Sequence, residues 1–302
     1  MKGRQAKSIR TILLSHILLS NSPAMPIHRS IETQTISDAE FEQVDGAVMR
    51  CAYAAHNHFG SRFNERIYEN DMAARLRAEG FDVQTQVPVT VTHGSFQKTY
   101  FLDLVVNRML YELKAVSDLV PEHDMQALHY AILQDVRLVK LINFGGSRVR
   151  GKLLTNAMHG VSRHEPKMKR TGWHPLSDAC ERLVRQLKDI IGDVGTHLDV
   201  RLYNEILVHN LGGEANCLHR VEVCVDGETR GTHLVQFHSP RHAFALTSFN
   251  APQPNYLRHL EVLLRHVPAL AGIQWINLNH SRVEITTATR PENQTAEWQT
   301  AE

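Results

Sequence analysis

The sequence has few cysteines and almost no net charge, and each shortage excludes a class of protein. Its four cysteines, Cys51, Cys180, Cys217 and Cys224, form no CxxC pair, so no disulfide framework is indicated. The formal net charge is only +1, so no overall field draws the chain to nucleic acid or to a membrane. Any such affinity has to be local, and a reducing cytoplasm is the predicted compartment.

The chain also lacks an apolar run long enough to cross a bilayer. The start, "MKGRQAKSIRTILLSHILLS", resembles a weak signal peptide, with basic residues before a short apolar stretch. His16 interrupts that stretch, and no small-x-small cleavage site follows it. We therefore expect residues 1–36 to be a disordered tail, or an upstream extension over residues 1–24, rather than a secretion signal.

The periodicity of apolar residues predicts one folded unit over residues 37–157. Ser37 followed by Glu40 is a capping box that starts the first helix. The order of elements is helix, helix, three strands, helix, strand, which is typical of a mixed α/β sheet with a meander and one crossover. The expected helices are 37–60, 64–79 and 121–135, and the expected strands are 82–96, 98–106, 109–116 and 137–144.

A similar pattern returns later in the chain. "FNERIYENDMAARL" (63–76) matches "LDVRLYNEILVHNL" (198–211), and "VKLINFGGSRVRGKLL" matches "IQWINLNHSRVEITTA" at nearly the same offset. This spacing indicates an internal duplication. The second unit is expected over 176–288, after a basic linker at 158–175 and before a polar tail at 289–302.

Basic residues gather after the last strand of the first unit, with Glu165 as the one acid among them. Two interpretations account for this basic segment. It is either a solvated connector between the two units or a strip of side chains that contacts phosphates. If the strip binds nucleic acid, the candidates nearest the first unit are Arg148, Arg150 and Lys152.

The stretch "FLDLVVNRMLYELKA" (101–115) places three charged residues inside an apolar strand pair. With Asn107-Arg108 as a two-residue turn, Val106 faces Met109 and Asp103 faces Glu112. Lys114 points to the same face as Glu112. Opposed carboxylates destabilise a sheet, and a divalent cation removes the conflict. A metal with a nearby lysine suits phosphodiester hydrolysis, whereas a surface hairpin with a simple ion pair is the plainer alternative.

The same residues resemble the core of the PD-(D/E)XK nuclease superfamily. Within it, "FGSRFNERIYEN" resembles the bacterial GxxExxY group, with Glu65 and Tyr68 at the named positions, and "EHDMQALHY" and "LINFG" match as well. The resemblance covers about residues 44–155. Two positions depart from it, because Arg62 stands at the glycine of the motif and Leu102 at the superfamily's proline.

The resemblance implies a restriction-endonuclease-like fold, here in two tandem copies, and a metal-dependent nuclease. It places catalytic roles on Asp103, Glu112, Lys114, Glu65 and Gln126. Mg²⁺ or Mn²⁺ is the implied cofactor, held by Asp103, Glu112 and Glu65, and DNA or RNA is the implied substrate. No oligomeric state follows from the sequence.

Other residues near these motifs have open roles. Tyr68 either orients Glu65 or packs in the core, and Glu69 is an alternative helix acid. Tyr130 is expected in the core, and Asn143 is expected to tie down a turn.

The second unit lacks the charged set. By alignment, Val200 replaces Glu65, Ala245 replaces Glu112, and Thr247 replaces Lys114. Leu260 aligns with Gln126, and Phe237 and His238 lie near the position of Asp103. We therefore expect an inactive second copy. The alternative to a nuclease is a non-catalytic module that binds nucleic acid or protein and retains a vestigial site.

Overall fold

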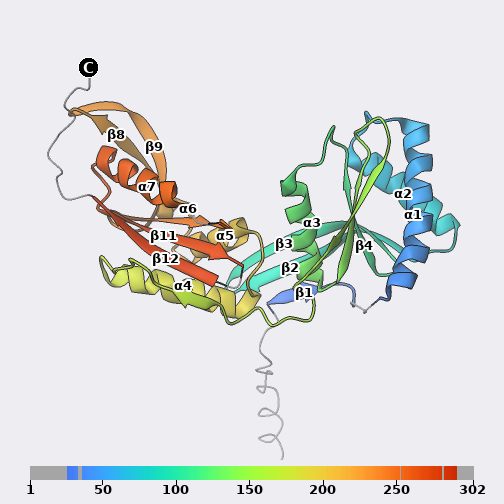
Figure 1. Cartoon of the computed structure of the whole chain (residues 1–302), viewed down its shortest axis with the longest axis horizontal. Helices are drawn as coiled ribbons and strands as arrows, with labels where there is room; N and C mark the ends of the chain where they lie inside the picture. Colours follow the sequence, from blue (N-terminus) through green and yellow to red (C-terminus); the bar gives the residue numbers. More distant parts are fainter. Residues whose placement is uncertain (1–25, 33–35, 252, 281, 291–302) are drawn as a thin grey trace, which may run out of the picture.

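The computed structural model describes residues 26–32, 36–251, 253–280 and 282–290. Two six-stranded sheets occupy opposite halves of an elongated molecule (Figure 1). The mixed α/β architecture predicted from the sequence is therefore confirmed. The expected extension over residues 1–24 and most of the polar tail lie outside the described residues. No helix in the described ranges is both long enough and apolar enough to span a membrane.

The first sheet has the order β1-β2-β3-β4-β5-β6, so the predicted charged hairpin β3–β4 lies at its centre. Only β4 and β5 run parallel, and helix α3 makes the crossover between them. Helices α1 and α2 pack on one face, and α3 packs on the other. The elements are β1 (Ile27–Arg29), α1 (Asp38–Phe59), α2 (Glu65–Ala78), β2 (Val83–His93), β3 (Phe96–Val106), β4 (Met109–Lys114), α3 (Pro121–Gln134), β5 (Leu138–Asn143) and β6 (Arg150–Thr155).

Local sequence signals account for the ends of several elements. The Ser37 hydroxyl accepts the Glu40 amide hydrogen, and the Glu40 carboxylate accepts that of Ser37, which completes the predicted capping box. Asn107 and Arg108 both have positive φ, +46° and +69°, as a type I′ hairpin turn requires. The predicted register follows from that turn, with Val106 opposite Met109.

The second sheet repeats the plan of the first, with the order β7-β12-β11-β10-β9-β8. Two long helices, followed here by the short α6, again precede a three-strand meander, and α7 crosses over to a strand parallel to β10. Its elements are β7 (Lys167–Lys169), α4 (Asp178–Val194), α5 (Val200–Asn210), α6 (Glu214–Cys217), β8 (Leu218–Val225), β9 (Glu228–Ser239), β10 (His242–Thr247), α7 (Pro254–His266), β11 (Gly272–Asn279) and β12 (Arg282–Thr289).

Two buried polar anchors occur in both units with the same bonds. The Tyr68 hydroxyl donates to the Gly60 carbonyl at 2.6 Å, and the Tyr203 hydroxyl donates to the Gly195 carbonyl at 2.6 Å. The Asn143 side chain bonds both backbone groups of Val116, and Asn277 does the same for Phe249. These pairs align the two units residue by residue.

Three short strands differ from the sequence expectations. Strand β1 lies within residues 1–36 and pairs with β2, so the folded unit begins before residue 37. Strand β6 lies in the basic stretch and pairs with β5. Strand β7 lies within the expected linker and pairs with β12. Edge strands this short carry too little apolar alternation to be seen in the sequence.

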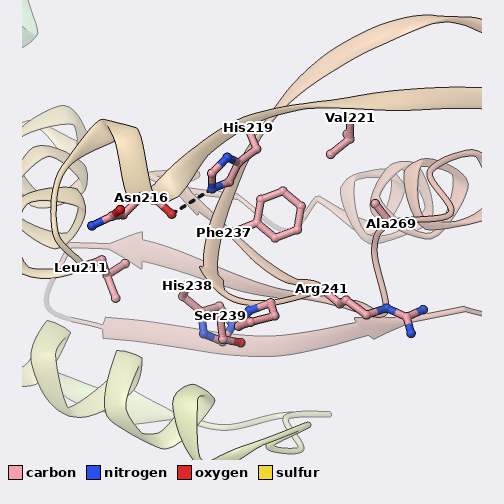
Figure 2. Close-up of a pocket in the computed structure, with 10 residues that line it drawn as sticks. Leu211, Asn216, His219, Val221, Phe237, His238, Ser239, Arg241 and Ala269 are labelled. Atoms are coloured by element: carbon pink, nitrogen blue, oxygen red, sulfur yellow. Dashed lines mark hydrogen bonds between the residues drawn. The ribbon is translucent and has the colours of Figure 1, made fainter.

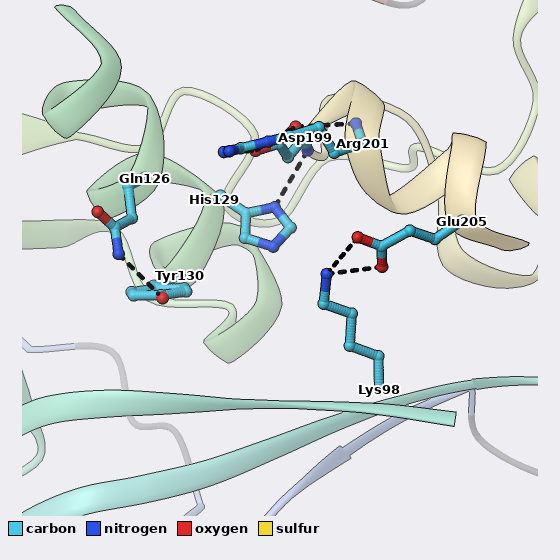
Figure 3. A network of polar contacts seen from close by, with 7 residues as sticks. All are labelled: Lys98, Gln126, His129, Tyr130, Asp199, Arg201 and Glu205. Carbon is cyan, nitrogen blue, oxygen red and sulfur yellow. Dashed lines mark hydrogen bonds and ion pairs between the residues drawn. The ribbon is translucent and has the colours of Figure 1, made fainter. Parts of the chain in front are cut away.

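The two units share a packed junction. The end of the β2–β3 hairpin reaches the second unit, where Lys98 pairs with Glu205 at 2.6 Å and His93 with Asp193 at 2.7 Å. One buried apolar cluster contains residues of β2, α3, α4 and α5. Figure 3 shows α3 and α5 facing one another across the polar part of this junction.

The paired tyrosine anchors give a stability prediction. Tyr203→Phe removes the hydroxyl and leaves the buried Gly195 carbonyl and Leu198 amide without that partner. We expect a loss of about 1–3 kcal/mol in the free energy of unfolding, measured by urea denaturation. Tyr256→Phe is the control, because that hydroxyl has no hydrogen-bond partner among the described residues. Equal, small effects of both substitutions would contradict the anchor role.

Candidate active site

Four predicted site residues converge at the end of strand β4. Glu112 and Lys114 lie on β4 with 1% and 7% of their surface exposed, Asp103 lies on β3, and Glu65 opens α2. Asp103 and Glu65 are half-buried. Glu112 and Lys114 share their face of β4 with Leu110, which packs in the same apolar cluster as Ala127 and Ala131 of α3. The charged groups therefore lie on the side of the sheet that α3 covers.

Glu112 is the most perturbed acid of this group. Burial and, to a smaller extent, the charge of Asp103 raise the pKa of its carboxyl to about 8, against the lowering effect of Lys114. One carboxylate oxygen, Oε1, accepts from Lys114 Nζ at 2.7 Å. The other, Oε2, is buried without a hydrogen-bond partner among the described residues. An orphaned buried oxygen of this kind is costly, and a further ligand could satisfy it.

Lys114 is held by Glu112 and by the Leu113 carbonyl, which its Nζ reaches at 3.1 Å. Burial alone would lower the pKa of Lys114, but the charges of Glu112, Glu65 and Asp103 outweigh it and raise that pKa. The lysine therefore stays cationic at neutral pH and faces the carboxylates.

Asp103 and Glu65 are tied to the backbone of β4 rather than to each other. Asp103 Oδ2 accepts the amide hydrogen of Leu113 at 2.8 Å, and Glu65 Oε1 accepts that of Ala115 at 3.2 Å. These bonds fix both acids beside the strand that carries Glu112. Each has a second oxygen for another partner.

Two residues belong to this network that sequence reasoning missed or ranked low. Gln86 Nε2 donates to Glu69 Oε2 at 2.7 Å and lies 3.4 Å from Asp103 Oδ1. Burial raises the pKa of Glu69, and the charge of Asp103 adds to that effect, whereas Gln86 and Arg66 lower it. The register of β2 against β3 places Gln86 opposite Asp103, so the predicted hairpin held a signal for it.

The structure also locates the other residues near the motifs whose roles the sequence left open. Gln126 donates to the Tyr130 hydroxyl at 3.1 Å instead of contacting a carboxylate, although the charges of Glu112 and Asp103 act on Tyr130. Tyr68 stacks on Phe144 with ring centroids 4.4 Å apart, so it packs and anchors the turn. Tyr130 is half-buried and packs against the apolar cluster that contains α3, at the edge of the core in which it was expected. Asn143 ties down the turn after β4, as predicted.

The candidate nucleic-acid contacts lie along the edge of the first sheet. Arg150 and Lys152 are on β6, where they pair with Asp118 and Asp124, and Arg148 precedes the strand. All three cations are exposed. Exposed ion pairs are weak, so these side chains remain free to exchange partners.

The donor set suits a small divalent cation only in part. Among the described residues, no group of three or more His, Cys, Asp and Glu side chains is placed to hold a metal, so the expected set of Asp103, Glu112 and Glu65 is not assembled. Two of them, Asp103 and Glu112, adjoin one another, and Glu112 Oε2 is unpartnered. Mg²⁺ binds through one or two carboxylates and keeps several waters, so this pair fits it.

The second unit has no acid at the corresponding strand positions. In the parallel strand register, Thr247 lies opposite Asn277, just as Lys114 lies opposite Asn143 in the first unit. Thr247 and Ala245 therefore occupy the places of Lys114 and Glu112. The β9–β10 register, continued from Ala243–Phe237, puts Val235 in the place of Asp103. This corrects the alignment with Phe237 and His238. Alignment of the first-turn prolines of α3 and α7 likewise gives His259, not Leu260, as the counterpart of Gln126.

A cavity of about 400 Å³ lies beside the β9–β10 turn, away from the four converging residues (Figure 2). Its described lining includes His219, Phe237 and Arg241 and has no carboxylate. His219 Nε2 is 3.0 Å from the Asn216 carbonyl. The cavity therefore does not reproduce the chemistry of the first unit.

Comparison with known proteins agrees with this geometry. The family model of the PD-(D/E)XK nuclease superfamily matches residues 42–153, a span that contains Glu65, Asp103, Glu112, Lys114 and Gln126. The resemblance to the superfamily is thereby confirmed, and the mixed sheet with flanking helices agrees with a restriction-endonuclease-like fold. No curated protein and no solved structure matches the chain.

The raised pKa of Glu112 predicts how stability changes with pH. The folded state holds this proton up to about pH 8, whereas an ordinary carboxyl releases it near 4.5. The folded state therefore binds more protons between these values, and the free energy of unfolding should fall as pH rises through this window.

In Glu112→Gln this contribution disappears. With a chelator present, we expect the fall in the free energy of unfolding between pH 5 and 8 to be smaller than in the wild type, by on the order of a few kcal/mol. Urea denaturation across pH measures it. Glu122→Gln, at an exposed position on α3, should keep the wild-type profile. A wild-type profile in Glu112→Gln would contradict the shift.

Proposed function

We propose that the first unit is a metal-dependent nuclease that hydrolyses phosphodiester bonds. The observation that carries the proposal is the buried, unpartnered Glu112 oxygen beside Asp103 and Lys114, inside the stretch that matches the nuclease superfamily. A carboxylate pair and a cation at the end of a central strand are costly in an apolar fold without a ligand. Glu65 and Tyr68 at three-residue spacing support placement in the bacterial GxxExxY group.

The roles follow from the positions of the side chains. Asp103 and Glu112 would hold Mg²⁺ or Mn²⁺, which supplies Lewis-acid stabilisation and a more acidic bound water. Lys114 keeps a positive charge facing that point and neutralises negative charge that builds up on a phosphoryl oxygen. Glu65 has one oxygen left after bonding Ala115 and can order water beside the metal. Gln126 acts through the Tyr130 hydroxyl.

The half-buried acids indicate where substrate enters. Glu112 lies deepest, whereas Asp103 and Glu65 keep contact with solvent. A phosphate would therefore approach across Asp103 and Glu65 toward Glu112. Arg148, Arg150 and Lys152 lie on the far edge of the same sheet and are proposed to contact the flanking nucleic-acid backbone.

We infer that the predicted catalytic domain, residues 37–157, also includes β1, and that the predicted inactive copy, residues 176–288, also includes β7 from the basic segment 158–175. The repeated tyrosine and asparagine anchors support common descent. The loss of every acid from the corresponding strand positions supports inactivity. We keep a cytoplasmic location as a prediction, with all four cysteines free.

The closed contact between Glu112 and Lys114 favours a second candidate function. Lys114 Nζ is already bonded to Glu112 and Leu113, and both side chains are nearly inaccessible. A site locked in this way suits a non-catalytic module that binds nucleic acid or protein and retains a vestigial site.

Cleavage assays separate the two functions. We expect Mg²⁺- or Mn²⁺-dependent cleavage of single- or double-stranded DNA or RNA, with a fall of 10²-fold or more in Glu112→Gln and Lys114→Met. Lys188→Met, at an exposed cation on α4, should retain full activity. Metal-independent binding that both site variants preserve, without any cleavage, would support the binding module instead.

The basic edge predicts a change in salt dependence. In a Glu112→Gln background, Arg148→Gln/Arg150→Gln/Lys152→Gln should make the slope of log K against log salt shallower by roughly two to three. Fluorescence anisotropy with labelled DNA measures it. The matched triple Arg182→Gln/Arg185→Gln/Lys188→Gln on α4 removes the same charges elsewhere and should keep the original slope. Equal slopes for the two triples would exclude the proposed contact.

A further inference from the structure

A cavity larger than the one in Figure 2 lies between the two units rather than at the candidate nuclease site. It measures about 620 Å³ and is bounded by α3 of the first unit and by the loops that surround the β10 and β11 strand ends of the second. Cavities of this size and interdomain location are typical of small-molecule sites.

This cavity occupies the place that the candidate active site has in the first unit. There, Glu65 contacts the amide of Ala115. The tyrosine anchors align Glu65 with Val200, and the asparagine anchors align Ala115 with Ser248. Val200 and Ser248 both line the cavity. The second unit thus has an apolar side chain, Val200, where the first has its helix acid, and a hydroxyl side chain, Ser248, where the first has Ala115, whose amide donates to that acid.

The charges around the cavity select against ionic ligands. No lysine or arginine is among its described lining residues. Burial lowers the pKa of His129 to about 4, and burial with neighbouring positive charge lowers that of His197, so both imidazoles are neutral at pH 7. The one acid in the lining, Asp199, already accepts bonds from the Arg201 backbone and guanidinium. A phosphate or an ammonium group would find no free counter-charge.

The walls differ in polarity. Met125, Leu128 and Ile132 of α3 give an apolar wall, whereas Ser248 and Asn250 give hydroxyl and amide groups on the opposite side. The His197 and His280 rings add a planar face, with centroids 5.4 Å apart and a tilt of 30°. An apolar wall, a ring face and neutral hydrogen-bonding groups fit a flat heterocycle with polar edges.

We propose that the second unit binds an uncharged heteroaromatic molecule of nucleoside size in this cavity, at the position of its lost active site. The ligand would touch α3, the helix that presents Gln126 and Tyr130 toward Glu112. The binding itself does not depend on whether the first unit cleaves nucleic acid.

Titration calorimetry on the full chain, without divalent metal, tests the binding. The probes are adenosine, guanosine, cytidine and uridine, each against its 5′-monophosphate. We expect at least one nucleoside to bind tenfold or more tightly than its monophosphate. Failure of all four nucleosides, or equal or tighter binding of the monophosphates, would overturn the proposal.

Matched variants then locate the site. Met125→Trp places a larger side chain at the apolar wall of the cavity and should weaken nucleoside binding at least tenfold. Met125 is 57% exposed, so the substitution is compatible with folding. Leu234→Trp makes a similar change on exposed β9, outside the cavity, and should leave affinity unchanged. If Met125→Trp leaves the nucleoside affinity unchanged, the assignment of the binding site to this cavity is wrong. Because no cleavage is read, this result is independent of the nuclease proposal.

Discussion

The burial of the Glu112 carboxyl in a central strand is the constraint on which the site depends. One of its oxygens bonds Lys114, and the other has no hydrogen-bond partner among the described residues. A buried charge destabilises the fold unless it is paired, so the lysine and the raised pKa of Glu112 are both consequences of its position. Asp103 and Glu65 are held by backbone amides of β4, which keeps their charges close to Glu112 although like charges repel.

The second unit separates what the fold needs from what the chemistry needs. Tyr203 and Asn277 make the same backbone bonds as Tyr68 and Asn143, so these polar anchors hold the helix entry and the strand crossover in both units. Thr247, in the place of Lys114, bonds the side chain of Asn277 at 2.8 Å. A threonine hydroxyl is satisfied locally, so the sheet is complete without charge. The second unit therefore forms the same sheet without the acids that the first unit carries.

The sequence predicted the hairpin well because its register follows from local chemistry. Asn107 suits the positive φ of this two-residue turn, which Arg108 also adopts, and the alternation of β3 and β4 then assigns the face of each side chain. The bond from Gln86 to Glu69 was not predictable in this way. Gln86 has a φ of +51°, outside the usual strand range, and its partner comes from a helix whose rotation depends on tertiary packing. The junction between the units escaped prediction for the same reason.

Helix α3 joins the two halves of the molecule because its faces have different neighbours. Gln126 and Tyr130 are one turn apart and lie near the carboxylates of the first unit. His129, adjacent in sequence, accepts the amide hydrogen of Asp199 at the start of α5, as Figure 3 shows. This bond and the shared apolar cluster tie α3 to the start of α5, so the helix that carries Gln126 and Tyr130 is positioned by contacts from both units.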